Sequence, residues 1–186
     1  MDNTDITAVN DEQLVAAAAS AAFADALAAA HATFHVEARD AAGELLWEED
    51  VHNVVTTAGK QLMLDVFFGA TAKPSWFMLL KGTGAAAKAD TLASHATWPE
   101  VTAYAGNRPA VTFSASTVYS TTGTQVTHSA ITFTINADGT TIAGLGVCTS
   151  ATGTTGTLYN AGDFPSARTL GNSDTINVTA TLQQLP

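Results

Sequence analysis

Residues 33–51, TFHVEARDAAGELLWEEDV, indicate the fold class of the chain. In the first half of this segment apolar and polar side chains alternate, which is typical of a strand with one buried face. The apolar positions are Phe34, Val36 and Ala38, and the polar positions are His35, Glu37 and Arg39. Residues 40–43 form a turn signal because Gly43 adopts positive φ at no steric cost, and residues 44–51 return as a second strand. The segment therefore predicts a β-hairpin.

Further extended runs follow this hairpin along the chain. They lie at residues 76–80, 111–117, 125–135, 140–148, 157–159 and 175–182. Residues 76–80 are apolar on both faces, which predicts a central strand, and residues 136–139 carry a hairpin signal. Gly144 and Gly146 indicate a bulge or a close backbone approach. About eight short strands with turns between them predict a mainly β fold, specifically a jelly-roll-like β-sandwich.

Two helices are expected beside these strands. Residues 11–30 are Ala-rich and follow a capping-box signal at Asn10 and Gln13. Their larger apolar side chains, at Val15, Phe23 and Leu27, lie on one narrow i+4 row. This helix is either an arm that docks on a neighbouring subunit or a helix packed on its own domain. Residues 58–68, capped by Thr56 or Thr57, are apolar nearly all round and predict a buried helix.

Composition limits the classes of function. The chain has 186 residues, a formal net charge of −10, 46% hydrophobic residues and 13% charged residues. This length suits one domain with a modest extension. We expect an acidic tail and an Ala-rich helical arm over residues 1–32 and one β-sandwich domain over residues 33–186. We expect no nucleic-acid partner, because phosphate binding needs clustered Lys and Arg. We expect no membrane span and no basic secretory signal, and the single cysteine, Cys148, is expected to be buried in a strand.

Residues 89–117 concentrate the polar and aromatic side chains that most resemble a site. We expect a short helix there, capped by Asp90 or Thr91 and ended by Pro99, followed by an irregular arm. Asp90, Ser94 and His95 are the residue types of a hydrolytic triad. Working triads draw on separate elements, however, and these residues crowd one short segment. We therefore expect no catalytic role for them.

Candidate metal ligands are few. His31 and His35 have the i, i+4 spacing of a metal pair, but the expected helix ends between them and no third ligand is evident. The acidic side chains of the hairpin are candidates for calcium, although no Asp-x-Asp-x-Asp loop surrounds them, and a solvated hairpin is the preferred interpretation. They are Glu44, Glu48, Glu49 and Asp50. His52 and His128 are isolated and are expected on strand surfaces. We predict no metal and no cofactor.

Several motifs resemble a family of small structural proteins of tailed bacteriophages. They are A-D-T-x-A-S-H-x-x-W-x-E-V-x-x-Y over residues 89–104 followed by N-R-P-A at residues 107–110, W-x-x-x-x-x-N-V-V-T-T-A-G-K over residues 47–60, W-F-M-L-L at residues 76–80, G-D-F at residues 162–164 and D-T-I-N-V-T at residues 174–179. The match covers residues 34–185.

This resemblance implies a non-enzymatic capsid cement or decoration protein. Such a protein is made in the host cytoplasm, binds the major capsid protein on the outside of the virion and associates with its own copies as a dimer or trimer. Trp98, Tyr104 and Arg108 are residue types favoured at interfaces. They either anchor this partner, which the resemblance favours, or fold the segment onto its own sheet. A receptor- or glycan-binding module of a tail or fibre is the alternative function.

Overall fold

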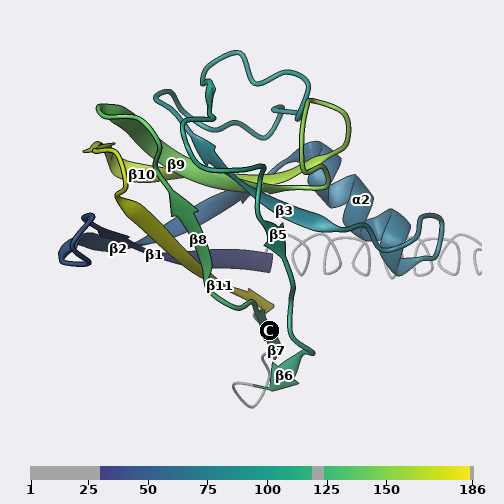
Figure 1. The fold of residues 1–186 in the computed structure, drawn as a ribbon. Helices are drawn as coiled ribbons and strands as arrows, with labels where there is room; N and C mark the ends of the chain where they lie inside the picture. Colours follow the sequence, from purple (N-terminus) through teal and green to yellow (C-terminus); the bar gives the residue numbers. More distant parts are fainter. Residues whose placement is uncertain (1–29, 119–123, 185–186) are drawn as a thin grey trace, which may run out of the picture.

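The structure is a computed structural model that describes residues 30–118 and 124–184 (Figure 1). The expected N-terminal helix, with Val15, Phe23 and Leu27, lies outside the described residues. Within them the chain is mainly β, as predicted, with one α-helix, α2 (Thr57–Phe67). The strands are β1 (Ala30–Arg39), β2 (Leu45–Val55), β3 (Trp76–Lys81), β4 (Glu100–Val101), β5 (Ala110–Val111), β6 (Thr117–Val118), β7 (Thr124–Thr127), β8 (Ile131–Thr134), β9 (Thr140–Cys148), β10 (Leu158–Leu170) and β11 (Thr175–Gln184).

The described strands form one antiparallel sheet in two groups. The order is β4-β3-β9-β10-β2-β1-β11-β7-β6, with β5 added on β3 and β8 added on β11. The long strand β2 joins the groups, because its residues 45–52 pair with β1 and its residues 53–55 pair with β10. One hydrophobic cluster contains side chains from both groups, among them Phe34 and Ile176 from one and Met78 and Leu145 from the other. The two groups therefore share a core.

The predicted β1–β2 hairpin is confirmed. Phe34, Val36 and Ala38 are all 0% exposed, and they alternate with side chains that face solvent. The turn between the strands has Gly43 at φ +88°. Asp40 Oδ1 stabilises this turn by accepting from the backbone N–H groups of Ala42 and Glu44, both at 2.9 Å. Local periodicity and turn chemistry thus agree with the tertiary structure here.

A second, smaller core covers the opposite face of β3, β9 and β10. Its buried members are Leu79, Leu92, Trp98, Cys148, Leu158 and Ala161. Leu92 and Trp98 belong to the connection between β3 and β4, which passes over this face of the sheet (Figure 1). Cys148 is 0% exposed, as expected, and burial raises the pKa of its thiol. This connection is therefore an extra layer on the sheet rather than a free loop.

The expected hairpin at residues 136–139 is wrong. Gly139 has φ +73° and reverses the chain, but β8 pairs with β11 while β9 pairs with β3 and β10. Backbone hydrogen bonds from Ile135 to Asp174 and from Ser173 to Ile135, each 2.8 Å, hold the end of β8 beside the β10–β11 connection. The turn therefore carries the chain from one group of strands to the other.

Strand β10 is much longer than the three residues expected. It runs from Leu158 to Leu170 and includes Pro165. Pairing with β9 shifts register between Asp163 and Arg168, where the proline lacks an N–H to donate. Gly144 lies against this strand, and a Cβ there would be 2.1 Å from the Gly162 carbonyl oxygen. The expected close approach at Gly144 is thus confirmed. Because proline is disfavoured inside strands, Pro165 argued against the long strand that the structure contains.

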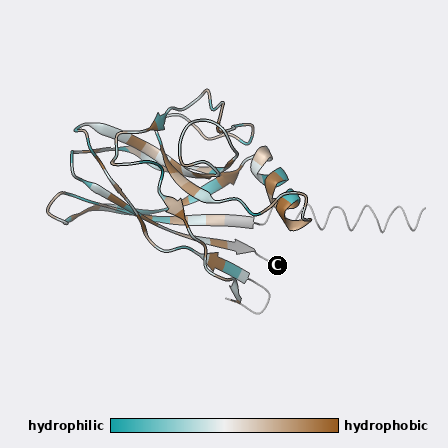
Figure 2. Ribbon diagram, turned by 45° about the vertical axis from the view of Figure 1, so that its right-hand side comes forward, coloured by the Kyte–Doolittle hydropathy of each residue, from teal (hydrophilic) through white to brown (hydrophobic). Residues whose placement is uncertain are grey.

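The prediction that helix α2 is buried is wrong. Thr56 caps it, because its side chain accepts from the Gly59 N–H at 2.9 Å. The Thr56 hydroxyl also donates to the Leu158 carbonyl at 2.5 Å, so the first turn is held against β10. Gly59 is the buried residue of α2, whereas Phe67 is 78% exposed. The helix projects past the sheet (Figure 2), and for this reason its apolar far end meets solvent.

His128 is also placed differently from the expectation. Its side chain is 6% exposed instead of lying on a strand surface. The Phe113 ring covers it at a centroid distance of 5.9 Å, and its Nδ1 lies 2.6 Å from the Ser129 carbonyl oxygen. Burial lowers the pKa of His128, and its Nε2 has no hydrogen-bond partner among the residues that the structure describes.

Candidate functional site

Trp98 is the centre of the connection between β3 and β4. Its ring is 2% exposed, and its Nε1 donates to Asp90 Oδ2 at 2.9 Å. The His95 ring stacks on the indole with a centroid distance of 3.9 Å and an interplanar angle of 12°. Asp90 also accepts from the Ala87 N–H at 2.8 Å. These contacts draw the segment around the indole.

The expected helix that starts at Asp90 or Thr91 is wrong. Residues 90–98 contain turns and no helix, with Thr91 N–H donating to the Ser94 carbonyl at 2.9 Å. The capping pattern did predict a local acceptor, because Thr91 Oγ1 accepts from Ser94 N–H at 3.0 Å. The Asp90 carboxylate, however, bonds the Trp98 indole instead of a first helical turn. A tertiary hydrogen bond thus replaces the local structure that propensity favoured.

Lys81 lies beneath this layer, and sequence reasoning missed it. Its side chain is 0% exposed, and its Nζ is 2.7 Å from Asp163 Oδ1. The ammonium also donates to the carbonyls of Gly82 and Gly84 and lies 5.5 Å from the centroid of the Trp98 ring. A lysine at the end of an apolar strand gives no sequence signal for such burial. The Lys81 ammonium therefore links β3 to β10 and to the connection between β3 and β4.

The residue types of a hydrolytic triad are not assembled in the structure. His95 Nδ1 lies 2.7 Å from the Trp98 carbonyl oxygen, and the Asp90 carboxylate is held by the Trp98 indole and the Ala87 amide. Ser94 is exposed, and its backbone carbonyl and N–H form hydrogen bonds with the Thr91 hydroxyl. No hydrogen bond joins any two of Asp90, Ser94 and His95, so a proton relay through them has no geometric basis.

Arg108 and Tyr104 lie inside the chain's own fold. Arg108 is 7% exposed and binds Glu100 through two hydrogen bonds of 2.7 and 2.5 Å, which raise the pKa of its guanidinium. The guanidinium also donates to the carbonyls of Ser150 and Gly153, each at 2.9 Å. Tyr104 is 5% exposed, and burial raises its pKa to about 12. Together with Trp98, these two residues therefore hold residues 89–117 on the chain's own sheet. This is the second of the two roles expected from the sequence, in which they do not anchor a partner.

A shallow pocket of about 350 Å³ lies over this ion pair. Its lining includes Glu100, Thr102, Arg108 and Thr154. The Arg108 guanidinium is already bound by a carboxylate and two carbonyl groups, so its charge is compensated from within the chain. The pocket thus offers a ligand no uncompensated charge from Arg108.

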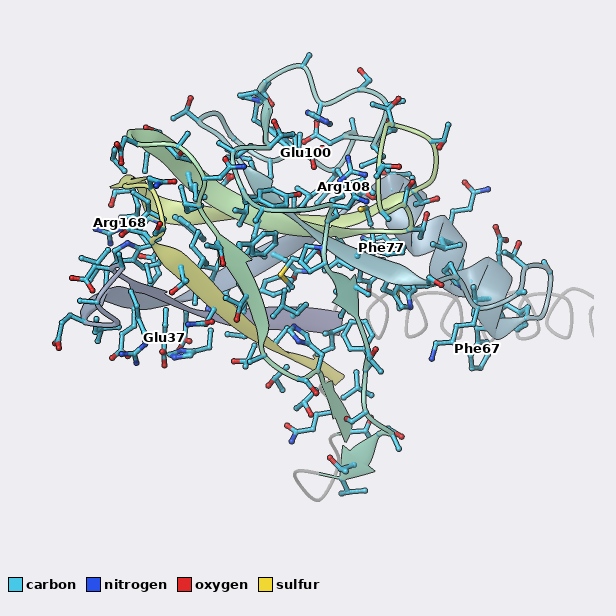
Figure 3. All side chains as sticks on the ribbon, viewed as in Figure 1. Glu37, Phe67, Phe77, Glu100, Arg108 and Arg168 are labelled. Atoms are coloured by element: carbon cyan, nitrogen blue, oxygen red, sulfur yellow. The ribbon has the colours of Figure 1, made fainter. Side chains whose placement is uncertain are left out.

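Among the residues that the structure describes, the most exposed pair of adjacent aromatic side chains lies at the end of α2, which we call the α2 tip (Phe67 and Phe68). The two side chains are 78% and 70% exposed, and their rings pack edge to face with centroids 5.0 Å apart. Figure 3 shows Phe67 at the far end of α2, away from the sheet. Other exposed large apolar residues are Leu45, Leu46 and Val118. Adjacent exposed aromatic rings on an anchored helix are typical of a binding surface.

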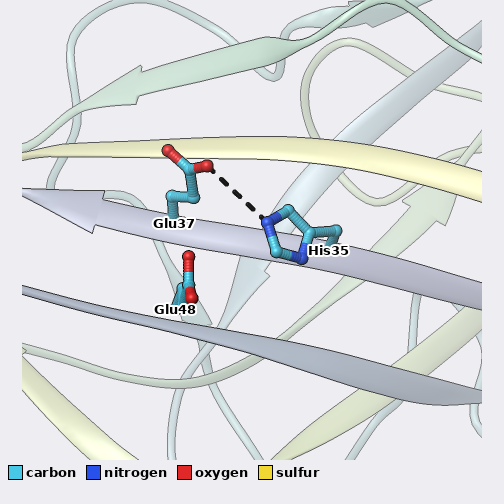
Figure 4. A group of neighbouring side chains, drawn as sticks. All are labelled: His35, Glu37 and Glu48. Atoms are coloured by element: carbon cyan, nitrogen blue, oxygen red, sulfur yellow. Dashed lines mark ion pairs between the residues drawn. The ribbon is translucent and has the colours of Figure 1, made fainter. Parts of the chain in front are cut away.

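Candidate cation ligands meet on the β1–β2 hairpin. His35, Glu37 and Glu48 each place one ligand atom within 4.8 Å of the others (Figure 4). The group differs from both sets considered from the sequence. His31 and His35 share strand β1 rather than a helix, and Glu49 pairs with Arg168 at 3.2 Å.

The helical residues that the structure describes include no segment of the length and hydropathy needed to cross a bilayer. The site residues therefore have to be interpreted from their own geometry and from the motifs of the sequence. Comparison of the chain with protein-family models, with curated proteins and with solved structures found no match.

Proposed function

We propose that this chain is a non-enzymatic structural subunit of a bacteriophage virion, which binds the capsid exterior as a cement or decoration protein. The observation that carries the proposal is the α2 tip, where two aromatic side chains are exposed at 78% and 70%. The phage-like motifs supply the class of partner, the major capsid protein and neighbouring copies of the chain. The two groups of strands around a shared core support a jelly-roll-like β-sandwich as the rigid body.

The α2 tip is suited to docking because it is presented by an anchored helix. Thr56 fixes the first turn of α2 through its hydrogen bonds to Leu158 and Gly59. The Tyr159 hydroxyl lies 3.1 Å from Met63 Sδ and holds the middle of the helix. An anchored element loses little conformational freedom on binding, so more of the burial energy is retained as affinity.

The expected gain per copy is moderate but repeated. Complete burial of one phenylalanine side chain stabilises by about 1.5–3 kcal/mol, so the pair would contribute about 3–6 kcal/mol. A capsid repeats the same contact over many symmetry-related sites, which multiplies the effect on the shell. The glycan-binding alternative loses the aromatic residue on which it depended, because Trp98 is 2% exposed and presents no ring face for a sugar.

Binding to capsid shells assembled without this chain tests the proposal. We expect the full-length chain to co-sediment saturably with the shells and to raise their thermal stability. The double substitution Phe67→Ser and Phe68→Ser should weaken binding at least tenfold, since it removes about 3 kcal/mol or more of apolar burial. Val118→Ser, at a position that is 76% exposed on β6, is the matched control and should bind normally. Failure of the unmodified chain to bind shells, or equal binding by the double variant, would refute this function.

A further inference from the structure

The exposed face of the β1–β2 hairpin brings metal-binding side chains together from both strands. Antiparallel register places His35 opposite Asp50 and Glu37 opposite Glu48. Residues two apart on a strand share a face, so these four side chains occupy the corners of one rectangle. The opposite face is the buried one, which carries Phe34 and other core residues. Strand pairing thus supplies the third ligand that was not evident from sequence spacing.

The distances fit one small cation. His35 Nε2 lies 3.6 Å from Glu37 Oε1, and the ligand atoms of His35, Glu37 and Glu48 all lie within 4.8 Å of one another. Ligands about 2.1 Å from a tetrahedral ion are separated by about 3.4 Å. The atoms that lie farthest apart would have to draw together by up to about 1.4 Å, a movement that side-chain rotation about the χ angles supplies. Figure 4 shows Glu37 and Glu48 on neighbouring strands, with the His35 imidazole to one side of them.

Asp50 orients the imidazole as the outer partner of a metal-bound histidine does. Its Oδ1 lies 2.9 Å from His35 Nδ1, on the side of the ring away from Nε2. A metal-ligating histidine usually gives its second ring N–H to a carboxylate, which fixes the tautomer and leaves the other nitrogen free for the ion. The arrangement at His35 therefore has an inner set of donors and an outer orienting group.

The charges around this group are incompletely compensated. Glu37 and Glu48 are directly opposite each other, and like charges at opposed positions of a ladder are unfavourable. Arg39 neutralises one carboxylate through its contact with Glu37 at 3.0 Å. On the other side of β1, strand β11 places the uncharged residues Asn177 and Thr179 opposite Glu37 and His35. A bound divalent cation would remove the repulsion between the two glutamates.

We infer that His35, Glu37 and Glu48 form a binding site for a first-row divalent metal ion of the zinc class, with Asp50 as the orienting residue. An imidazole with carboxylates suits zinc and its neighbours, whereas calcium and magnesium favour all-oxygen sets. The inference is independent of the proposed capsid role.

Titration of the untagged full-length chain with zinc chloride, followed by calorimetry, tests the inference. We expect one zinc ion per chain at neutral pH, and cobalt chloride should give the visible absorption of a protein-bound Co²⁺ ion. His35→Gln and Glu48→Gln should each weaken binding at least tenfold. Asp50→Asn should weaken it by about tenfold, the usual effect of losing an outer partner. All three positions are on the exposed face, and circular dichroism checks that the variants are folded.

Two control variants separate this site from incidental binding. His52→Gln removes a second exposed histidine of the hairpin, on β2, and Glu44→Gln removes an exposed carboxylate of the same hairpin outside the proposed site. Both should bind zinc as the unmodified chain does. The inference is overturned if zinc does not bind, if His35→Gln and Glu48→Gln leave the affinity unchanged, if His52→Gln weakens it equally, or if calcium binds here in preference to zinc.

Discussion

Removal of Asp163 should destabilise the fold more than removal of its partner Lys81. The Lys81 side chain is 0% exposed, whereas that of Asp163 is 41% exposed, and their charged atoms lie 2.7 Å apart. Asp163→Asn leaves a buried ammonium with two backbone carbonyls and the Trp98 ring as its remaining partners. Breaking a buried pair from one side costs about 3–5 kcal/mol, and because the Asp163 carboxylate is partly exposed, we expect a loss of about 3 kcal/mol.

Lys81→Met should be milder because no buried charge remains. The apolar stem still packs beneath Trp98, and the released Asp163 carboxylate is sufficiently exposed to regain water. What is lost is the set of charge-assisted hydrogen bonds to the carbonyls of Gly82 and Gly84, so we expect a loss of about 1–2 kcal/mol. The double variant should be no less stable than Asp163→Asn alone, because it removes both charges.

Urea unfolding followed by tryptophan fluorescence measures all three free energies. The Trp98 indole lies 5.5 Å from the Lys81 ammonium, so the signal reports on the same layer. A double-mutant cycle then isolates the coupling between the two side chains. The reasoning is refuted if Asp163→Asn stays within about 0.5 kcal/mol of the unmodified chain, the range of an ordinary surface substitution. It is also refuted if Lys81→Met proves the more damaging change.

Three further outcomes are expected. Gly59→Ala would place a methyl group 2.1 Å from the Tyr159 carbonyl oxygen, so the free energy of unfolding should fall by about 1–3 kcal/mol in urea titrations despite the better helix propensity of alanine; an unchanged midpoint would contradict the packing of α2. Burial lowers the pKa of His128, so protons bind the unfolded chain first and stability should fall as the pH drops below about 6.5. His128→Gln should flatten this dependence below about pH 6.5, and parallel curves for the two chains would argue against it. Trp98→Phe removes the N–H that donates to Asp90, so amide exchange over residues 87–98 should accelerate by about tenfold, the effect of one lost hydrogen bond, and unchanged exchange would show that the indole does not hold this layer.

Local patterns predicted the parts of the fold that short-range physics determines. The alternation around Phe34 indicated the buried face of β1, and Gly43 indicated the turn that follows it. Thr56 and Thr57 were the two predicted caps of α2, and Thr56 is the cap, because its hydroxyl oxygen accepts from the first turn of the helix. Each of these features depends on residues within a few positions of one another. The sequence is sufficient for them.

The features that sequence reasoning missed depend on partners far along the chain. Lys81 is buried because Asp163, 82 positions later, supplies its counter-charge. Helix α2 has the composition of a buried helix, but its contacts with β10 come from its cap at Thr56 and from Met63, and Phe67 beyond them remains exposed. Glu37 and Glu48 become neighbours through strand register, which is set by the whole sheet rather than by spacing. No local pattern contains this information.

The two proposed sites can be tested separately because the fold keeps them apart. Figure 3 places Glu37 on the β1–β2 hairpin and Phe67 at the opposite end of the molecule. The hairpin site lies on the solvent face of a paired ribbon, whereas the α2 tip is carried by a helix anchored to β10 at Thr56. Loss of metal ligands should therefore leave capsid binding unchanged, and loss of the aromatic rings should leave zinc affinity unchanged, since distant sites without shared contacts act additively. If His35→Gln also abolished shell binding, the metal would have to lie within the capsid interface, and the α2 tip alone would not explain docking.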